Sequence, residues 1–346
     1  VEPATISTVL EPVQAPPLTE AAPVKMRAPW HCKAVVFAAM CILVGIVWDI
    51  SWHETIGRDT FWTPAHMAIY LCGVFAGIAA GASILVTTLR GGEGVRMWGF
   101  RGPLGAFIIA WGGVAMLTSA PFDDWWHSAY GLDVAILSPP HTVLIAGIAA
   151  IEFGALILIA GAMNRAEGAE RARLQWLALY VGGLMTVGQL LAVMEYSDAA
   201  LMHSGIFYRV VATVVPLLFA CTARATGHRW ATTVVASFYT AFMLGFEWIL
   251  PLFPAEPKLG PVYHPVTQFI PPGFPFLLIA PAIALDLLAR KSGSWKRWVA
   301  AAAAGAVFVG VFVAAQWPFA SFLMTPAARN WVFGVHYFDF MTPPEW

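Results

Sequence analysis

Residues 33–89 indicate the fold class most clearly and read KAVVFAAMCILVGIVWDISWHETIGRDTFWTPAHMAIYLCGVFAGIAAGASILVTTL. Two apolar runs, at 33–50 and 64–89, flank a short polar link. Each run is long enough for a helix that crosses a bilayer, which needs roughly 17 to 25 mainly apolar residues. The stretch therefore predicts a hairpin of two membrane-spanning helices joined at one membrane surface.

The rest of the chain continues this pattern. Only 11% of its 346 residues are charged and 59% are hydrophobic, whereas about a quarter of a soluble domain is charged. We predict an all-α, polytopic membrane helical bundle in the lipid bilayer, with about nine transmembrane helices. The near-neutral net charge of −1 argues against a nucleic-acid partner. The predicted spans are 33–50, 64–89, 103–121, 139–163, 174–194, 207–223, 230–250, 270–289 and 298–316.

Basic residues predict the orientation, because short cytoplasmic loops collect Lys and Arg. When the loops are assigned alternately to two sides, one side holds all of the 19 basic residues except Arg58, Arg209, Lys258 and Arg329. We expect a bacterial-type inner (cytoplasmic) membrane, a cytoplasmic N-terminus and a C-terminus outside. The outer side would then carry the acidic and histidine residues of the link in the first hairpin.

Internal repetition suggests how the chain is organised. Residues 1–29 form a Pro- and Ala-rich arm, and 30–346 form the transmembrane domain. Within it we predict tandem hairpin repeats at 33–89 and 103–163. Diverged hairpins at 174–223 and 230–289, a last helix at 298–316 and an outer tail at 317–346 follow.

Both repeats carry the same three polar residues. Asp49 and His53 are four residues apart, which places them on one helical face, and His66 follows in TPAH, where Thr63 is expected to cap the next helix. The second repeat places Asp123, His127 and His141 at the matching positions, with a link one residue longer. We therefore expect one helix end and the next helix start to converge in each hairpin.

Two imidazoles and a carboxylate are suitable ligands for copper, zinc or Fe(II), and these residue types alone do not select among the metals. Asp59 and Asp133 would accept hydrogen bonds from the far ring nitrogens of the ligating histidines. Glu247 and His264 are weaker candidates, because Pro251 stands where the middle histidine should be. The alternative is a polar network that only satisfies helix ends.

The first hairpin resembles a copper-binding membrane subunit of the copper membrane monooxygenases, the family of particulate methane and ammonia monooxygenases. Asp49, His53 and His66 match the spacing of the copper ligands in that family, and the RDT and TPAH motifs match its loop. The resemblance implies copper, O₂-dependent hydroxylation of a small apolar substrate, and other membrane subunits as partners. It does not extend to methane or ammonia as the substrate.

Two other classes of membrane protein compete with this interpretation. One is a non-catalytic scaffold or accessory subunit of a larger redox or energy-transducing complex, with a structural metal or none. The other is a transporter built from repeats, which we rank last because the hairpins run in parallel and no span is clearly interrupted at mid-depth.

Overall fold

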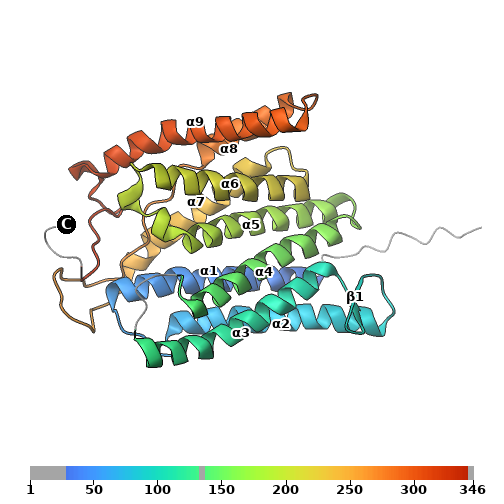
Figure 1. Ribbon diagram of the computed structural model, residues 1–346, viewed down its shortest axis with the longest axis horizontal. Helices are drawn as coiled ribbons and strands as arrows, with labels where there is room; N and C mark the ends of the chain where they lie inside the picture. Colours follow the sequence, from blue (N-terminus) through green and yellow to red (C-terminus); the bar gives the residue numbers. More distant parts are fainter. Residues whose placement is uncertain (1–28, 132–136, 342–346) are drawn as a thin grey trace, which may run out of the picture.

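The computed structural model describes residues 29–131 and 137–341, and its helices run side by side along the longest axis (Figure 1). A two-stranded antiparallel sheet of β1 (Val95–Met97) and β2 (Phe100–Gly102) joins the second helix to the third. The prediction of an all-α polytopic bundle is confirmed. The helices are α1 (Trp30–Thr55), α2 (Pro64–Leu89), α3 (Leu104–Tyr130), α4 (Pro139–Met163), α5 (Gly168–Ala192), α6 (Gly205–Thr226), α7 (Ala231–Ile249), α8 (Ile279–Lys291) and α9 (Arg297–Leu323).

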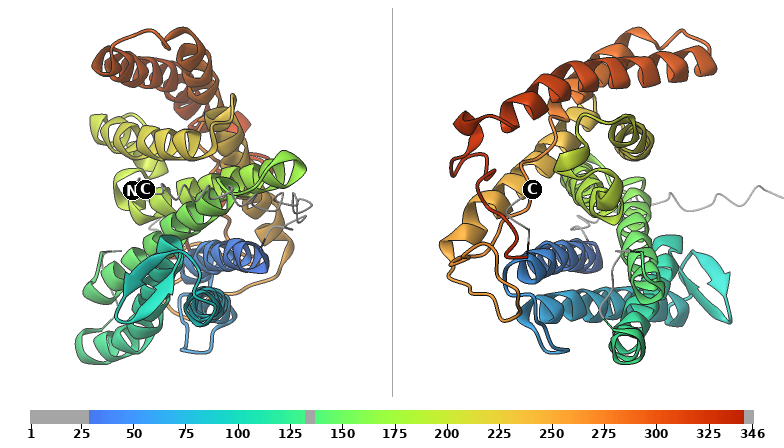
Figure 2. Two further views of the ribbon diagram at one scale, coloured as in Figure 1. Left: turned by 90° about the vertical axis from the view of Figure 1, so that its right-hand side faces the viewer. Right: turned by 60° about the vertical axis from the view of Figure 1, so that its left-hand side comes forward.

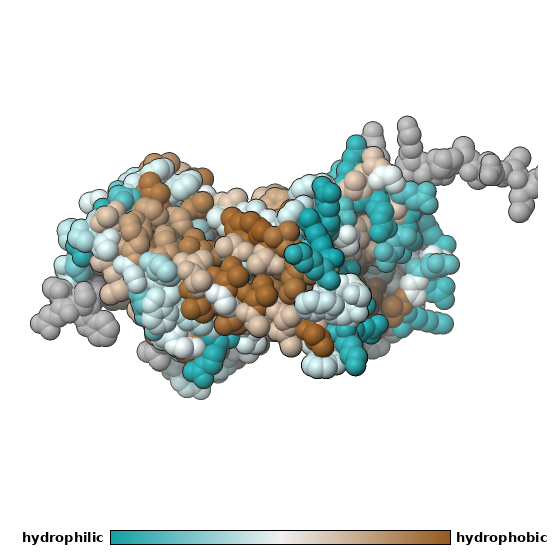
Figure 3. Space-filling model, turned by 90° about the horizontal axis from the view of Figure 1, so that it is seen from above, coloured by the Kyte–Doolittle hydropathy of each residue, from teal (hydrophilic) through white to brown (hydrophobic). Residues whose placement is uncertain are grey.

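Among the described residues, eight helices are long and apolar enough to cross a membrane, namely all of α1 to α9 except α8. The surface in Figure 3 shows hydrophobic residues over the middle of the molecule and hydrophilic ones gathered toward the end away from the C-terminus. The chain is therefore a multi-pass membrane protein. Residues 1–28, nearly all of the predicted N-terminal arm, lie outside the described residues.

The helices form a stack with α9 at one edge and α2 and α3 at the other (Figures 1 and 2). Consecutive helices pair as hairpins in the first half, because α1 contacts α2 and α3 contacts α4. The helix α1 also packs on α4 and α5, so the first hairpin is tied to the centre of the stack. Both predicted repeats are thus antiparallel helix pairs whose links lie at the same end of the molecule.

The eighth predicted span, 270–289, is not a continuous helix. Residues 270–278 are not helical, and α8 contains only 13 residues, or about 20 Å of helix against a hydrocarbon core of about 30 Å. Pro271, Pro272 and Pro275 explain the difference, because proline lacks the backbone N–H of a helix interior. Hydropathy alone does not detect this interruption.

Contacts with other helices satisfy the backbone of the irregular segment. The N–H of Ile270 donates to Thr55 Oγ1 at 2.9 Å, and the N–H of Leu277 donates to Gln316 Oε1 at 2.9 Å. The N–H of Phe276 donates to the Tyr239 hydroxyl at 3.1 Å. Within a membrane, non-helical backbone is tolerated where protein surrounds it in this way. The prediction of a continuous helix over 270–289 is therefore wrong for its first nine residues.

The C-terminal segment folds back over the end of the bundle that carries the hairpin links. Phe340 is fully buried, and its carbonyl accepts a hydrogen bond from the Tyr263 N–H at 2.8 Å. Trp248 Nε1 donates to the carbonyl of Val332 at 3.1 Å. The segment predicted as an outer tail therefore begins as the last turns of α9 and then packs across the loops at this end.

Candidate metal centres

The first candidate centre lies where α1 ends and α2 begins. Asp49 and His53 project from the last turns of α1, which continues to Thr55 rather than ending at residue 50. His66 is the third residue of α2. The ligand atoms of these three side chains lie within 4.8 Å of one another. The structure therefore brings the predicted residues together into a group that could hold a metal ion.

A close approach between α1 and α2 assembles this group. Gly45 lies one turn before Asp49, and a Cβ atom added to it would lie 2.9 Å from the Ile69 N atom and 3.1 Å from the Ala65 carbonyl oxygen. These two residues flank His66 in α2. Small residues allow membrane helices to pack this closely, so Gly45 sets the distance between Asp49 and His66.

The spacing of the donor atoms fits a shared cation. His66 Nε2 lies 3.2 Å from Asp49 Oδ1, and His53 Nε2 lies 3.8 Å from Asp49 Oδ2. Metal bonds of about 2.0–2.1 Å at tetrahedral angles separate neighbouring donors by about 3.3–3.4 Å. The shorter contact is close to this value, and the longer one needs only a small movement of an exposed side chain, since His53 is 45% exposed.

Asp59 is placed differently from the expectation. Its Oδ2 atom lies 3.3 Å from His66 Nε2 and 3.7 Å from His53 Nε2. These are the ring nitrogens that also face Asp49, rather than the far nitrogens at which an outer acceptor would lie. Asp59 therefore faces the same two ring nitrogens as Asp49, although it is not part of the group of three whose ligand atoms all lie within 4.8 Å of one another.

Several backbone contacts hold the link that carries Asp59. Trp52 Nε1 donates to the Arg58 carbonyl at 3.0 Å, and the Lys258 N–H donates to the Ile56 carbonyl at 2.9 Å. Thr63 occupies the capping position of α2, but its hydroxyl accepts from the Thr60 N–H at 2.8 Å. The predicted helix cap is thus a loop contact, because the link turns back on itself before α2.

The second candidate centre repeats the arrangement at the end of α3 and the start of α4. His127 Nε2 and His141 Nε2 each lie 3.4 Å from an oxygen of Asp123. His141 is the third residue of α4, as His66 is of α2, and Ser138 caps α4 as predicted. The ligand atoms of Asp123, His127 and His141 again lie within 4.8 Å of one another.

A contact with the backbone fixes the orientation of the His127 ring. Its Nδ1 atom lies 3.1 Å from the Gly131 carbonyl oxygen, which is an acceptor. Nδ1 therefore carries the proton, and Nε2 faces Asp123. This is the usual arrangement of a metal-binding histidine, whose second nitrogen donates to a backbone carbonyl. Asp133, the predicted outer acceptor of this centre, lies outside the described residues.

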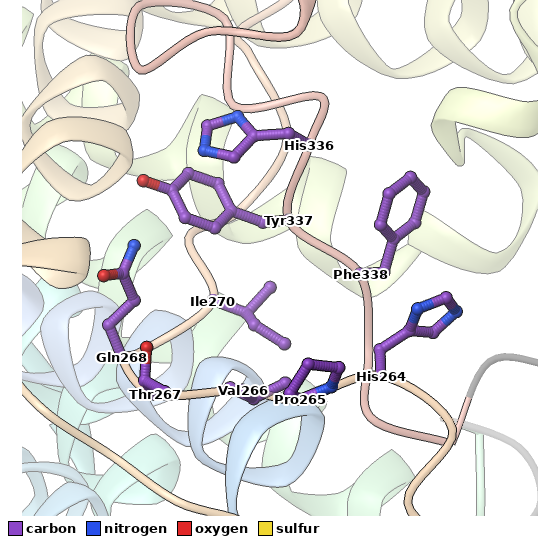
Figure 4. Close-up of a pocket in the computed structure, with 9 residues that line it drawn as sticks. All are labelled: His264, Pro265, Val266, Thr267, Gln268, Ile270, His336, Tyr337 and Phe338. Atoms are coloured by element: carbon purple, nitrogen blue, oxygen red, sulfur yellow. The ribbon is translucent and has the colours of Figure 1, made fainter.

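The weaker candidates, Glu247 and His264, do not join a comparable group among the described residues. Glu247 is fully buried at the end of α7, under Gly334 of the C-terminal segment. His264 lines a pocket of about 270 Å³ between residues 264–270 and 336–338 (Figure 4). The spacing of 17 residues alone therefore does not reproduce the hairpin geometry, because a long irregular loop replaces the short link.

Glu152, in the middle of α4, is a separate buried acid. It is fully inaccessible, and one of its carboxylate oxygens accepts a hydrogen bond from Gln189 Nε2 at 3.1 Å. Gly188 leaves room for the other oxygen, since an added Cβ would lie 2.7 Å from it. Its partner is thus on α5, and the pair joins two helices in the interior of the bundle.

Sequence reasoning missed two contributors to the first centre. Gly45 is one of many small residues in apolar runs, and nothing in its neighbourhood marks it as the closest approach of two helices. Phe340 lies far along the chain but packs on the link, where an added Cβ at Gly57 would lie 2.6 Å from its ring. In the sequence, Gly57 is matched by Gly131 in the second repeat, each four residues after a histidine, but nothing there indicates a contact with Phe340.

Comparison with known proteins assigns the chain to no family. No protein-family model matches the chain, and no match was found among curated proteins or solved structures.

Proposed function

We propose that the chain is an integral membrane, metal-binding subunit of a multisubunit, O₂-dependent hydroxylating complex that acts on a small apolar substrate. The observation that carries the metal site is the convergence of Asp49, His53 and His66 from two helix ends. Copper is our choice of metal because the same residues and their link resemble the copper-binding hairpin of the copper membrane monooxygenases. Asp123, His127 and His141 would form a second site of the same kind.

The residues of the first centre have distinct tasks in this proposal. His66 and Asp49 are the better shielded donors, with 17% and 20% of their side chains exposed, and they fix the ion between two helices. His53 is more exposed and lies on the side from which an external molecule can approach. Bound copper would supply the chemistry toward O₂. The protein would supply an open coordination position, as catalytic metal sites require.

We also propose the orientation of the subunit. The hairpin links with both centres would face the outside of a bacterial-type inner membrane, and the N-terminus would be cytoplasmic. The uneven distribution of Lys and Arg supports this orientation. Lipid would cover the apolar middle of the bundle, and other membrane subunits would bind part of that surface.

A scaffold or accessory subunit of a larger redox or energy-transducing complex is the second candidate. One observation favours it: each carboxylate lies close enough to imidazole nitrogens to form an ion pair when the histidine is protonated. In that state the two centres would be polar networks that tie helix ends together. Such a subunit would contain a structural metal or none.

Purification of the complex from native membranes separates the two candidates. We expect copper in stoichiometric amounts, co-purifying subunits in the mass spectrum, and O₂ consumption that depends on a small apolar substrate. His53→Ala should lower both the copper content and the O₂ consumption, whereas Arg58→Gln in the same link should change neither. A complex that assembles without metal and shows no O₂ uptake would support the scaffold instead.

A further inference from the structure

A fourth side chain reaches the first centre. A single oxygen of Asp59, Oδ2, lies 3.3 Å from His66 Nε2 and 3.7 Å from His53 Nε2. Asp49 approaches the same two nitrogens at 3.2 Å and 3.8 Å, but with a different oxygen for each. Asp59 is therefore as close to both histidines as Asp49 is. The group whose ligand atoms all lie within 4.8 Å of one another holds only Asp49, His53 and His66, so an ion shared by all four side chains would draw the two carboxylates together.

The position of Asp59 is fixed by the fold around it. Gly57 has a positive φ of 78° and packs against the ring of Phe340, so a side chain at this position would strain the turn that leads to Asp59. The Arg58 carbonyl accepts from Trp52, and the Thr60 N–H donates to Thr63. Hydrogen bonds on both sides of Asp59 thus hold its backbone in place. Such support is what keeps donor atoms within the roughly 0.5 Å that a functional site tolerates.

The charge of the cluster indicates the kind of cation. As metal ligands, Asp49 and Asp59 would contribute two negative charges, and the imidazoles of His53 and His66, which bind metal in the neutral form, would contribute none. A divalent ion would neutralise the cluster, whereas a monovalent ion would leave one negative charge at the end of a membrane bundle. Carboxylate and imidazole donors also suit divalent metals, while Cu(I) is selected by the softer sulfur ligands.

We propose that Asp59 is a fourth protein ligand of the first centre, in a two-Asp, two-His set for a divalent metal ion with more than four coordination positions, so that a position stays open. This inference rests on the proposed metal-binding function and adds a ligand to it. It predicts that Asp59 touches the ion directly, so its replacement changes the coordination of the metal as well as its affinity.

Cobalt(II) bound to the purified full-length protein provides the test, because its absorption reports its ligands. The experiment uses a His141→Ala background, which confines Co²⁺ to the first centre. Asp59→Cys should produce a thiolate-to-cobalt charge-transfer band that the background protein lacks. Arg58→Cys is the matched control, because it places a thiol at the exposed neighbouring position, and it should give no such band.

Asp59→Asn provides the second measurement, in the same background. Loss of an outer hydrogen-bond acceptor lowers metal affinity by about 10- to 100-fold, and loss of a direct ligand should lower it by more, with an unchanged melting temperature. Either the charge-transfer band or this larger loss supports the proposal. Absence of both overturns it while leaving the other three ligands in place. If the background protein binds no Co²⁺ at all, both this inference and the proposed metal-binding function fail.

Discussion

Gly45→Ala is the smallest change that should pull the first centre apart without touching a ligand. The added methyl group would lie 2.6 Å from Ile69 Cγ1, 2.9 Å from the Ile69 N atom and 3.1 Å from the Ala65 carbonyl oxygen. The Ile69 side chain can move aside, but the two backbone atoms belong to α2 itself. The helices must therefore separate where Asp49 and His66 meet.

The size of this movement follows from the contact distances. Ordinary van der Waals contact begins near 3.4 Å, so the 2.9 Å contact requires the helices to separate by about half an ångström. That shift equals the roughly 0.5 Å tolerance of a preorganised site. We expect metal affinity to fall by about tenfold or more, which corresponds to about 1.4 kcal/mol. Overpacking should also cost about 1–3 kcal/mol of stability.

Chelator competition would measure the metal affinity, and a thermal melt in detergent would measure the stability. Gly77→Ala is the matched control, because Gly77 lies in α2, the helix that Gly45 contacts, and an added Cβ there meets nothing within 4 Å. It should leave both quantities unchanged or slightly improve the stability. If Gly45→Ala binds metal as tightly as the wild type, the close approach of α1 and α2 does not assemble the centre.

Three further changes test other parts of the structure. Asp286→Ala should lower the free energy of unfolding by about 2 kcal/mol, because buried Asp286 accepts hydrogen bonds from the N–H groups of Thr232 and Thr233 at the start of α7. Asp198 is an exposed residue that caps the short helix Ala199–Leu201. An equal loss of stability in a thermal melt of Asp198→Ala would contradict this prediction. Gly57→Ala should lower metal affinity more than Gly91→Ala in chelator competition, since both glycines have positive φ but only Gly57 packs against Phe340; equal effects would mean that the Phe340 contact is irrelevant. Acidification from about pH 7.5 to about pH 5 should release the metal, because protons compete for the histidine and carboxylate donors; metal content that stays constant in dialysis across this range would exclude these ligands.

Much of the fold could be predicted because membrane helices follow hydropathy. The apolar runs at 64–89 and 139–163 coincide with α2 and α4, whose first turns carry Pro64 and Pro139 as start signals. The segment 270–278 is equally apolar but is not helical, since its prolines interrupt helical hydrogen bonding, and the N–H groups of Phe276 and Leu277 bond instead to side chains on α7 and α9. Such partners are determined by tertiary packing, which a pattern along one segment does not contain.

In the candidate site, too, local patterns could be predicted from the sequence and tertiary contacts could not. Asp49 and His53 could be paired from their spacing of four residues, because helical geometry fixes the distance between them. The place of Asp59 depends on the path of a link, which depends in turn on Phe340 from the far end of the chain. Spacing therefore predicted the residues on helices, and the contacts of the loop residue became visible only in the structure.

Metal stoichiometry shows whether the two Asp–His–His groups bind metal ions. Purified wild type, His66→Ala, His141→Ala and the double variant would each be loaded with Cu²⁺ or Zn²⁺, freed of excess ion by dialysis and analysed for bound metal per chain, with circular dichroism as the check on folding. We expect each single variant to lose one of the ions bound by the wild type and the double variant to lose both. A folded double variant that retains the metal content of the wild type would show that the two Asp–His–His groups are not the metal centres.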